Sequence, residues 1–156
     1  MIHDASRDTF DCRRVQVTSP PLTRREYAYF KVAGPGTHET VTQALGMTPS
    51  ECGNVGDPNP RTGRPRRFMA WYLRSGLDDT EELSAHIDSL LLALGPRAEA
   101  LRSLWVDYTL TMQCVGYFPE TGHGAHFDRE VLRRLANLGL ALDLDFYHVP
   151  DHGHEP

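Results

Sequence analysis

Histidine is the residue type in this chain with the clearest capacity for chemistry, and five of its eight histidines lie after residue 120. His123 and His126 are three residues apart in a glycine-containing loop, and Asp128 follows closely. Neutral imidazoles and a carboxylate are suitable ligands for Zn, Fe, Ni or Cu. These three residues form a candidate site for a divalent transition metal. The alternative is a polar loop whose histidines contact only solvent, and both interpretations remain open.

A second candidate site is an arginine-rich loop with the sequence GNVGDPNPRTGRPRR. Its arginines, Arg61, Arg64, Arg66 and Arg67, suit a phosphate or carboxylate, because a guanidinium can bind such a group through two parallel hydrogen bonds. The neighbouring glycines would let backbone amides approach the anion. The loop lacks the GxxxxGK[ST] and GxGxxG nucleotide-binding motifs. The alternative is a solvated loop whose positive charges offset the acidic remainder of the chain.

Aromatic residues on the expected strands form a third candidate surface. Tyr27, Tyr29 and one face of the strand that contains Trp71 could line a concave sheet surface for a ligand or a partner protein. The same residues could instead pack in the core of a sheet that is covered on both sides.

Nucleophilic and carboxylate catalysis have weaker support in the sequence. Cys52 and Cys114 have no histidine beside them, and a cysteine in a strand is usually a small buried apolar residue. Asp143 and Asp145 share one face of a strand, where charge protects a sheet from edge pairing. No GxSxG serine motif occurs. The sequence therefore contains no assembled catalytic motif, and whether the protein is an enzyme stays open.

Composition narrows the class of protein. A length of 156 residues fits one domain, and the net charge of −5, from 16 basic and 21 acidic residues, disfavours a general nucleic-acid binder. No apolar run approaches the roughly 20 residues that cross a membrane. The N-terminus lacks the apolar segment of a secretory signal, and three sparse cysteines indicate a reducing compartment. We expect a cytoplasmic protein that binds neither nucleic acid nor membrane.

The stretch from Phe127 to Tyr147 gives the clearest structural signal. Asp128 can cap a helix whose apolar residues recur at helical spacing, and Gly139 can end it. Four apolar residues then alternate with other residues between positions 140 and 147. This period of two predicts a strand with one apolar face.

The remaining elements are predicted from similar patterns. We expect an α+β fold in which a four-stranded sheet packs against helices, as two ferredoxin-like strand-helix-strand units. Asp79 should open the longest helix, with Glu82 as its capping-box partner, and Gly95 and Pro96 should break it. The expected strands are 26–32, 67–75, 107–118 and 140–147; the first helix is 37–45, and 48–66 is a long loop.

The predicted domain organisation has three parts. Residues 1–23 form a polar N-terminal arm, in which Val15 and Val17 could make a short edge strand. Residues 24–149 form the α+β domain. Residues 150–156 form a flexible C-terminal tail that contains His152 and His154.

Five segments of the chain resemble a bacterial family, domain of unknown function 4279. They are ALGMTPS (44–50), GNVGD (53–57), AWYLRSG (70–76), AHIDSLLLALGP (85–96) and LANLGLALDLDFY (135–147). The resemblance covers about residues 26–148 and implies a small α+β domain without a particular activity. The HGAHFD segment and the HVPDHGHE tail do not belong to this pattern.

Two functional hypotheses follow. The first is a non-catalytic binding or interaction module of an immunity or regulatory type, with a protein partner or a small anionic ligand. The second is a metal-dependent enzyme or metal-binding protein that uses the histidine-rich loop and acts on a small anionic molecule. A homodimer is compatible with either hypothesis.

Overall fold

The computed structural model describes residues 24–150. The predicted arm, with Val15 and Val17, and residues 151–156 of the predicted tail lie outside the described residues. The elements in chain order are β1 (Arg25–Gly34), α1 (His38–Leu45), β2 (Glu51–Gly53), β3 (Met69–Arg74), α2 (Leu83–Leu94), the 3-10 helix η1 (Gly95–Arg97), α3 (Ala98–Leu104), β4 (Thr109–Phe118), α4 (Arg129–Asn137) and β5 (Ala141–His148).

One mixed sheet forms the centre of the α+β fold. Its strand order is β2-β3-β1-β4-β5, with β4 and β5 parallel and the other pairs antiparallel. The predicted count of four strands is wrong, because the described part of the chain contributes five. The missed strand, β2, lies within the segment predicted as a loop. Three residues are too few to show the alternation that identifies a strand.

The two predicted strand-helix-strand units differ in geometry. The strands of the first, β1 and β3, run antiparallel, whereas β4 and β5 of the second run parallel on either side of α4 in the chain. A ferredoxin-like arrangement is therefore not confirmed.

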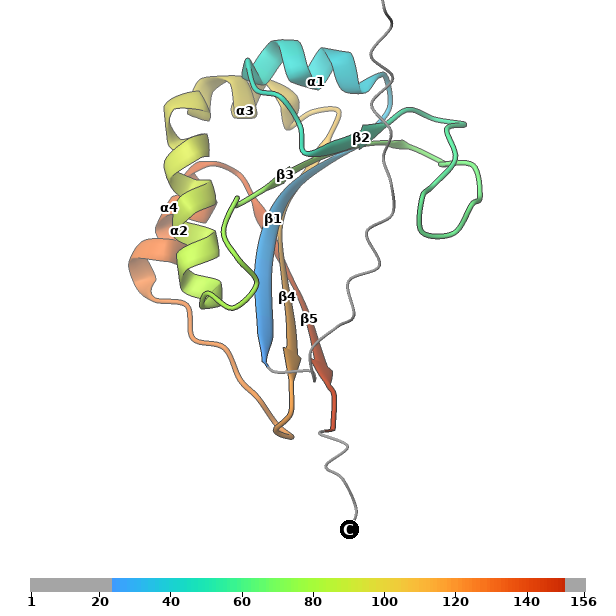
Figure 1. Ribbon diagram of the computed structural model, residues 1–156. Coiled ribbons are helices and arrows are strands. Elements are labelled where there is room, and N and C mark those ends of the chain that lie inside the picture. Colours follow the sequence, from blue (N-terminus) through green and yellow to red (C-terminus); the bar gives the residue numbers. More distant parts are fainter. Residues whose placement is uncertain (1–23, 151–156) are drawn as a thin grey trace, which may run out of the picture.

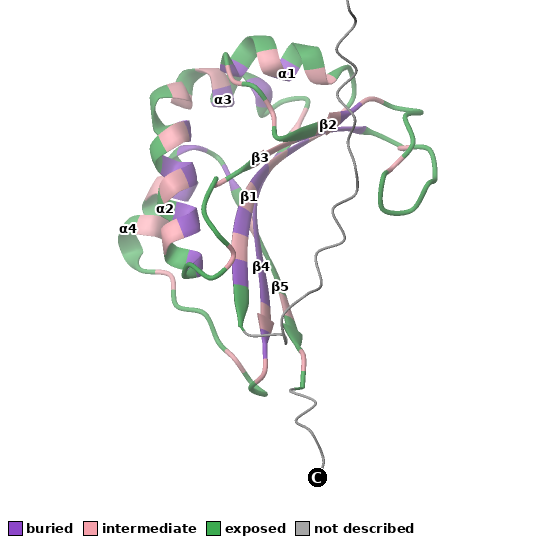
Figure 2. Ribbon diagram, in the orientation of Figure 1, coloured by how far each residue is buried: buried purple, intermediate pink, exposed green. Residues whose placement is uncertain are grey.

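The helices lie on one side of the sheet, which we call the covered face (Figure 1). On β1, Ala28, Phe30 and Val32 point to this face and are at most 2% exposed. Their neighbours Tyr27 and Tyr29 point to the opposite side and are only partly buried, an alternation visible along β1 in Figure 2. The buried side chains pack against the apolar stripe of α2, which includes Ile87, Leu90, Leu91 and Leu94.

The start of α2 differs from its predicted start. The helix begins at Leu83 with Glu82 as its N-cap, but the Glu82 side chain makes no capping hydrogen bond. Asp78 and Asp79 instead organise the preceding turn, because Asp78 accepts from the Thr80 backbone N–H at 2.9 Å and Asp79 pairs with Arg25 at 2.9 Å. The predicted capping box at Asp79 is therefore wrong.

The predicted helix and strand near the C-terminus are confirmed. Asp128 caps α4 by accepting from the Val131 N–H at 2.8 Å. Gly139 ends this region with a φ of +68°, a conformation that a side chain disfavours. The indole of Trp105 packs directly on Gly139 and donates to the Leu138 carbonyl at 3.2 Å. This contact fixes the turn that directs β5 alongside β4.

Candidate functional site

A row of tyrosines crosses the side of the sheet opposite the helices, which we call the open face. Tyr27 and Tyr29 stack with their ring centroids 6.4 Å apart, and Tyr29 meets the edge of Tyr72 at 5.7 Å. Tyr117 and Tyr147 stack at 5.1 Å, and Arg25 lies over both Tyr27 and Tyr117. The row reaches from β3 through β1 and β4 to the edge strand β5, so five of the six tyrosines in the chain share one face.

The arginine loop stands at the β3 end of this row. The segment between β2 and β3 projects away from the helices (Figure 1). Backbone hydrogen bonds hold it as an irregular hairpin, with Gly56 N–H to Arg66 O at 2.9 Å and Asn59 N–H to Arg64 O at 2.8 Å. Pro58 and Pro65 form an isolated bridge within it. The predicted long loop therefore has internal structure that positions its arginines.

Arg66 differs from the other arginines of the loop because its side chain is 7% exposed. Its guanidinium pairs with Glu51 at 3.1 Å, and its stem lies over Gly53, where a side chain would collide with it. The Arg66 Nε has no hydrogen-bond partner among the described residues. Arg66 thus attaches the loop to β2, while Arg61, Arg64 and Arg67 remain exposed.

Two adjoining hollows occupy the junction of the loop and the open face. One has a volume of about 150 Å³ and is lined by residues that include Tyr29, Tyr72, Arg61 and Arg74. The other, of about 400 Å³, includes Arg64 and Arg67 in its lining. Lys31, Asn59, Arg66 and Tyr72 line both hollows. The structure thus places the four predicted arginines and Tyr29 around one continuous surface, with Tyr27 beside Tyr29 in the tyrosine row.

Trp71 does not share this surface. Its side chain is fully buried on the covered face, where its ring meets Phe30 at 6.0 Å and its indole N–H donates to the Thr42 hydroxyl at 3.0 Å. Trp71 and Tyr72 face opposite sides of β3, and Tyr72 is the one that joins the tyrosine row. Including Trp71 among the ligand-binding residues was therefore wrong.

The opposite end of the open face is acidic. Asp143 and Asp145 lie on β5 in register with Gln113 and Val115 of β4, on the tyrosine side of the sheet. The Gln113 amide donates to Asp145 at 3.0 Å. The open face therefore changes from basic at the arginine loop to acidic at β5, with tyrosines between the two ends.

Burial raises the pKa values of two tyrosines of the row. Partial burial raises the pKa of Tyr27, and the neighbouring Tyr117 adds to the shift. Burial also raises the pKa of Tyr29, while the positive charge of Arg61 opposes that shift. Both phenols therefore remain neutral hydrogen-bonding groups at physiological pH.

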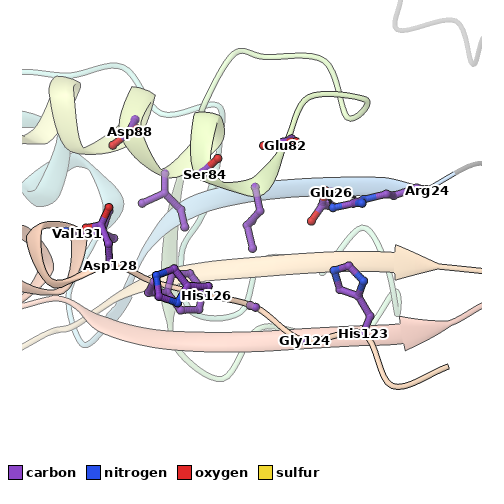
Figure 3. A pocket seen from close by; sticks show the side chains of 14 residues that line it. Arg24, Glu26, Glu82, Ser84, Asp88, His123, Gly124, His126, Asp128 and Val131 are labelled. Atoms are coloured by element: carbon purple, nitrogen blue, oxygen red, sulfur yellow. Dashed lines mark hydrogen bonds and ion pairs between the residues drawn. The ribbon is translucent and has the colours of Figure 1, made fainter. Parts of the chain in front are cut away.

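The predicted histidine site lies elsewhere, in a pocket of about 350 Å³ on the covered side (Figure 3). Residues 123–128 form one wall, and the start of α2 forms another. Arg24 and Glu26 reach the pocket from the start of β1. His123, His126 and Asp128 all line it, so the structure brings the three predicted residues to one pocket.

These three side chains are not arranged as a set of metal ligands. His123 stacks on Phe118 with centroids 3.5 Å apart, and Asp128 is the N-cap of α4. Within residues 24–150, no group of three or more histidine, cysteine, aspartate or glutamate side chains is arranged to hold a metal ion. The geometry of the pocket therefore gives the metal hypothesis no support.

The cysteines of the described region are poor nucleophiles. Cys114 is buried on β4 facing the helices, and desolvation raises the pKa of its thiol to about 12. Burial also raises the pKa of Cys52. Since the thiolate is the nucleophile, the raised pKa values lower the reactivity of both thiols at neutral pH.

Several surface residues were not identified from the sequence. Tyr72, Lys31 and Arg74 complete the basic end of the open face, and their positions follow from the β1–β3 register, which a single sequence does not reveal.

A buried carboxylate, Glu26, was also not identified from the sequence. Glu26 has the same strand parity as Ala28 and Phe30 and is only 6% exposed. A carboxylate at a core-facing position was the signal that could have identified it.

Within residues 24–150, no helix is long and apolar enough to cross a membrane. Residues 24–149 match a family model described as "Domain of unknown function (DUF4279)". No curated protein and no solved structure matches the chain.

Proposed function

The chain belongs to the DUF4279 family, and we propose that it is a non-catalytic binding module whose open face recognises an acidic surface or segment of a partner protein. The observation that carries this proposal is the tyrosine row on the face that no described helix covers, with the arginine loop at its end. An immunity or regulatory protein would act in this way, by occupying a surface of its partner.

The side chains on the open face are of the types that dominate protein interfaces. Tyrosine and arginine are enriched at the residues that contribute most to binding, and tyrosine loses little conformational entropy when it is ordered. The contacts of Tyr29 with Tyr27 and Tyr72 already restrict its ring before any partner arrives. Such preorganisation lowers the entropic cost of association.

The charge distribution favours an acidic partner at the β3 end. Lys31, Arg61, Arg64 and Arg74 line the two hollows, and the nearest lining carboxylate, Glu51, is paired with Arg66. Asp143 and Asp145 give the β5 end the opposite sign. A partner with complementary charges would therefore bind in one orientation, since like charges would repel in the reverse one.

A protein partner fits this surface better than a small anion or a nucleic acid. The tyrosine row extends across four strands, which is wider than the two hollows that could hold a small molecule. The acidic β5 end and the net charge of −5 would repel a phosphate backbone that followed the row.

Fluorescence anisotropy with a labelled decamer of glutamate tests this proposal at low salt. We expect the decamer to bind, and we expect Arg61→Gln and Tyr72→Ala each to weaken binding about tenfold, the loss of one charged or aromatic contact. Arg102→Gln is the matched control, because Arg102 is exposed on α3 and removal of its charge alters the net charge equally.

Any of three results would overturn the proposal. One is an equal loss of affinity in the Arg102 control, which would show that binding follows net charge alone. The other is a tighter interaction with a ten-nucleotide oligothymidine than with the glutamate decamer, which would assign the face to nucleic acid. Binding of free citrate that matches the decamer in affinity would assign it to a small anion and would also contradict the proposal.

A further inference from the structure

The outer edge of β5 is a backbone surface that no strand of the described region covers. β5 is the last strand of the sheet, and its partner there is β4. The Val149 N–H donates to the Phe118 carbonyl at 2.8 Å. Because the backbone groups of a strand alternate between its two edges, the N–H groups of Leu142, Leu144 and Phe146 then point away from β4. An edge of this kind can pair with a further strand.

The side chains of β5 would suit a neighbouring strand of alternating basic and apolar residues. Asp143 and Asp145 lie on the open face, and within residues 24–150 neither pairs with a basic side chain. Leu144 has the parity of the covered face but is 46% exposed, whereas Leu142 and Phe146 on the same side pack against the core. A strand beside β5 would therefore be stabilised by a basic residue on the open face and by apolar residues on the covered side.

The chain contains such a segment before β1. Residues 13–18 have the sequence RRVQVT, in which one polar residue separates Val15 from Val17 and Arg14 comes immediately before them. Valine and threonine favour strands. Since side chains alternate between the faces of a strand, Arg14 lies on the side of the two β5 aspartates when both valines are on the side of Leu144. The segment therefore complements β5 in both charge and apolar pattern.

The position of β1 allows this segment to reach the edge of β5. Arg25, the first residue of β1, is in register with Tyr117 of β4, which is in register with Tyr147 of β5. A strand beyond β5 would lie three strand spacings from β1, about 14 Å. Residues 19–24 can span about 20 Å when extended. Because residue 18 would lie nearest to this end of the sheet, residues 13–18 would run in the same direction as β5.

We propose that residues 13–18 pair with the free edge of β5 as an additional parallel strand, with Val15 and Val17 beside Leu144 and Arg14 beside the aspartates. A second copy of the chain fits this edge less well, because pairing β5 with itself would bring the acidic side chains of the two copies together. The inference goes beyond the proposed function, since it concerns the edge of the sheet and not the basic end of the open face. Failure of either proposal therefore leaves the other intact.

Amide hydrogen exchange of the ¹⁵N-labelled full chain, followed by NMR, tests this pairing. In the wild-type protein we expect the outward amides of Leu142, Leu144 and Phe146 to exchange slowly. Val15→Asn combined with Val17→Asn should speed their exchange at least about tenfold, because the hydrogen bonds to the added strand are lost. The β5 amides that bond to β4 should keep their protection in this variant, which shows that the domain remains folded.

Matched variants separate the effect of residues 13–18 from a general change in the N-terminal segment. Ile2→Asn combined with Phe10→Asn removes two apolar side chains outside residues 13–18 and should leave exchange at β5 unchanged. Arg14→Glu should speed exchange of the outward amides severalfold, since it places like charges beside each other. Arg7→Glu makes the same change in net charge and should have no effect.

Light scattering at the concentration of the exchange experiment identifies the occupant of the edge. We expect the mass of a monomer and protection that does not depend on concentration. A dimer mass with protection that is lost on dilution would assign the edge to a second copy and overturn the proposal. Rapid exchange of the outward amides in the wild-type protein, or an unchanged rate in the double valine variant, would overturn it as well.

Discussion

The two faces of β3 show how one short strand serves two purposes. Trp71 is fully buried against Phe30 and the α1 hydroxyl of Thr42, whereas Tyr72, the next residue, lies among arginines on the open face. Both side chains are aromatic and of similar size. The difference between them comes from strand parity alone, which sends successive side chains to opposite faces.

This contrast extends across the sheet. The covered face contains apolar side chains that stabilise the fold, and its one buried carboxylate on β1, Glu26, lies at the edge of that core. The open face contains charged side chains and tyrosines that are partly buried or exposed. We infer that substitutions on the covered face change stability, whereas substitutions on the open face change recognition.

Alanine substitutions of the two neighbouring aromatic residues on β3 should test this contrast with the largest effect. Trp71→Ala removes a large buried ring and its hydrogen bond, so the free energy of unfolding should fall by about 3–5 kcal/mol. Tyr72→Ala should change it by about 1 kcal/mol or less, since the side chain is partly exposed. Urea denaturation followed by circular dichroism measures both values. Equal losses would show that the open face is part of the core.

The thiol of Cys114 reports on the covered face. With its pKa raised to about 12 by burial, its thiolate fraction at pH 8 should be about a thousandfold below that of a thiol with the ordinary value near 9. We expect iodoacetamide to modify Cys114 only when urea unfolds the protein. Peptide mass spectrometry identifies the modified cysteine. Rapid alkylation in native buffer would contradict the packing of β4 against the helices.

Gly53→Ala should detach the arginine loop from β2. The added methyl group would lie 2.5 Å from the Arg66 Nε and would displace that side chain from β2. We expect severalfold weaker binding of the glutamate decamer. Because the Arg66 side chain is nearly buried and paired with Glu51, we also expect a loss of stability, smaller than that of Trp71→Ala. Gly56→Ala is unsuitable as a control, since Gly56 has a φ of +89° and a side chain there would be strained. Ala44→Gly, at an exposed position on α1, serves instead.

The smallest expected effect concerns pH. Burial raises the pKa of Tyr27 and Tyr29, so the folded state retains their protons at a pH where the unfolded chain releases them. Their contribution to stability is complete below about pH 10 and falls as pH rises through the folded pKa values. Thermal unfolding between pH 8 and 11 should show this decrease, and Tyr29→Phe should reduce it. An unchanged slope in Tyr29→Phe would contradict the role of Tyr29.

Much of the fold could be predicted from the sequence because its elements have clear periodicity. The alternation from Leu140 to Tyr147 gave β5, and Asp128 and Gly139 marked the limits of the preceding helix. β2 could not be predicted, because three residues show no period and their pairing with β3 depends on tertiary contacts. The direction and order of the strands depend on the same contacts.

The candidate sites were predicted only in part. The composition of the loop identified its arginines, but the register that places Tyr72 and Lys31 beside them is a property of the sheet. His123 and His126 line one pocket. Their spacing in the sequence could not reveal that His123 stacks on Phe118 or that Asp128 caps a helix. These local contacts decided the geometry of the pocket.

The most direct test of the central claim is an NMR titration of the uniformly ¹⁵N-labelled protein with the glutamate decamer. The binding-module account predicts shifts that cluster at Tyr29, Lys31, Tyr72 and the loop of residues 54–68, and that fade as salt is added. Shifts that cluster instead on α2 and α3, on the covered side, would contradict the account.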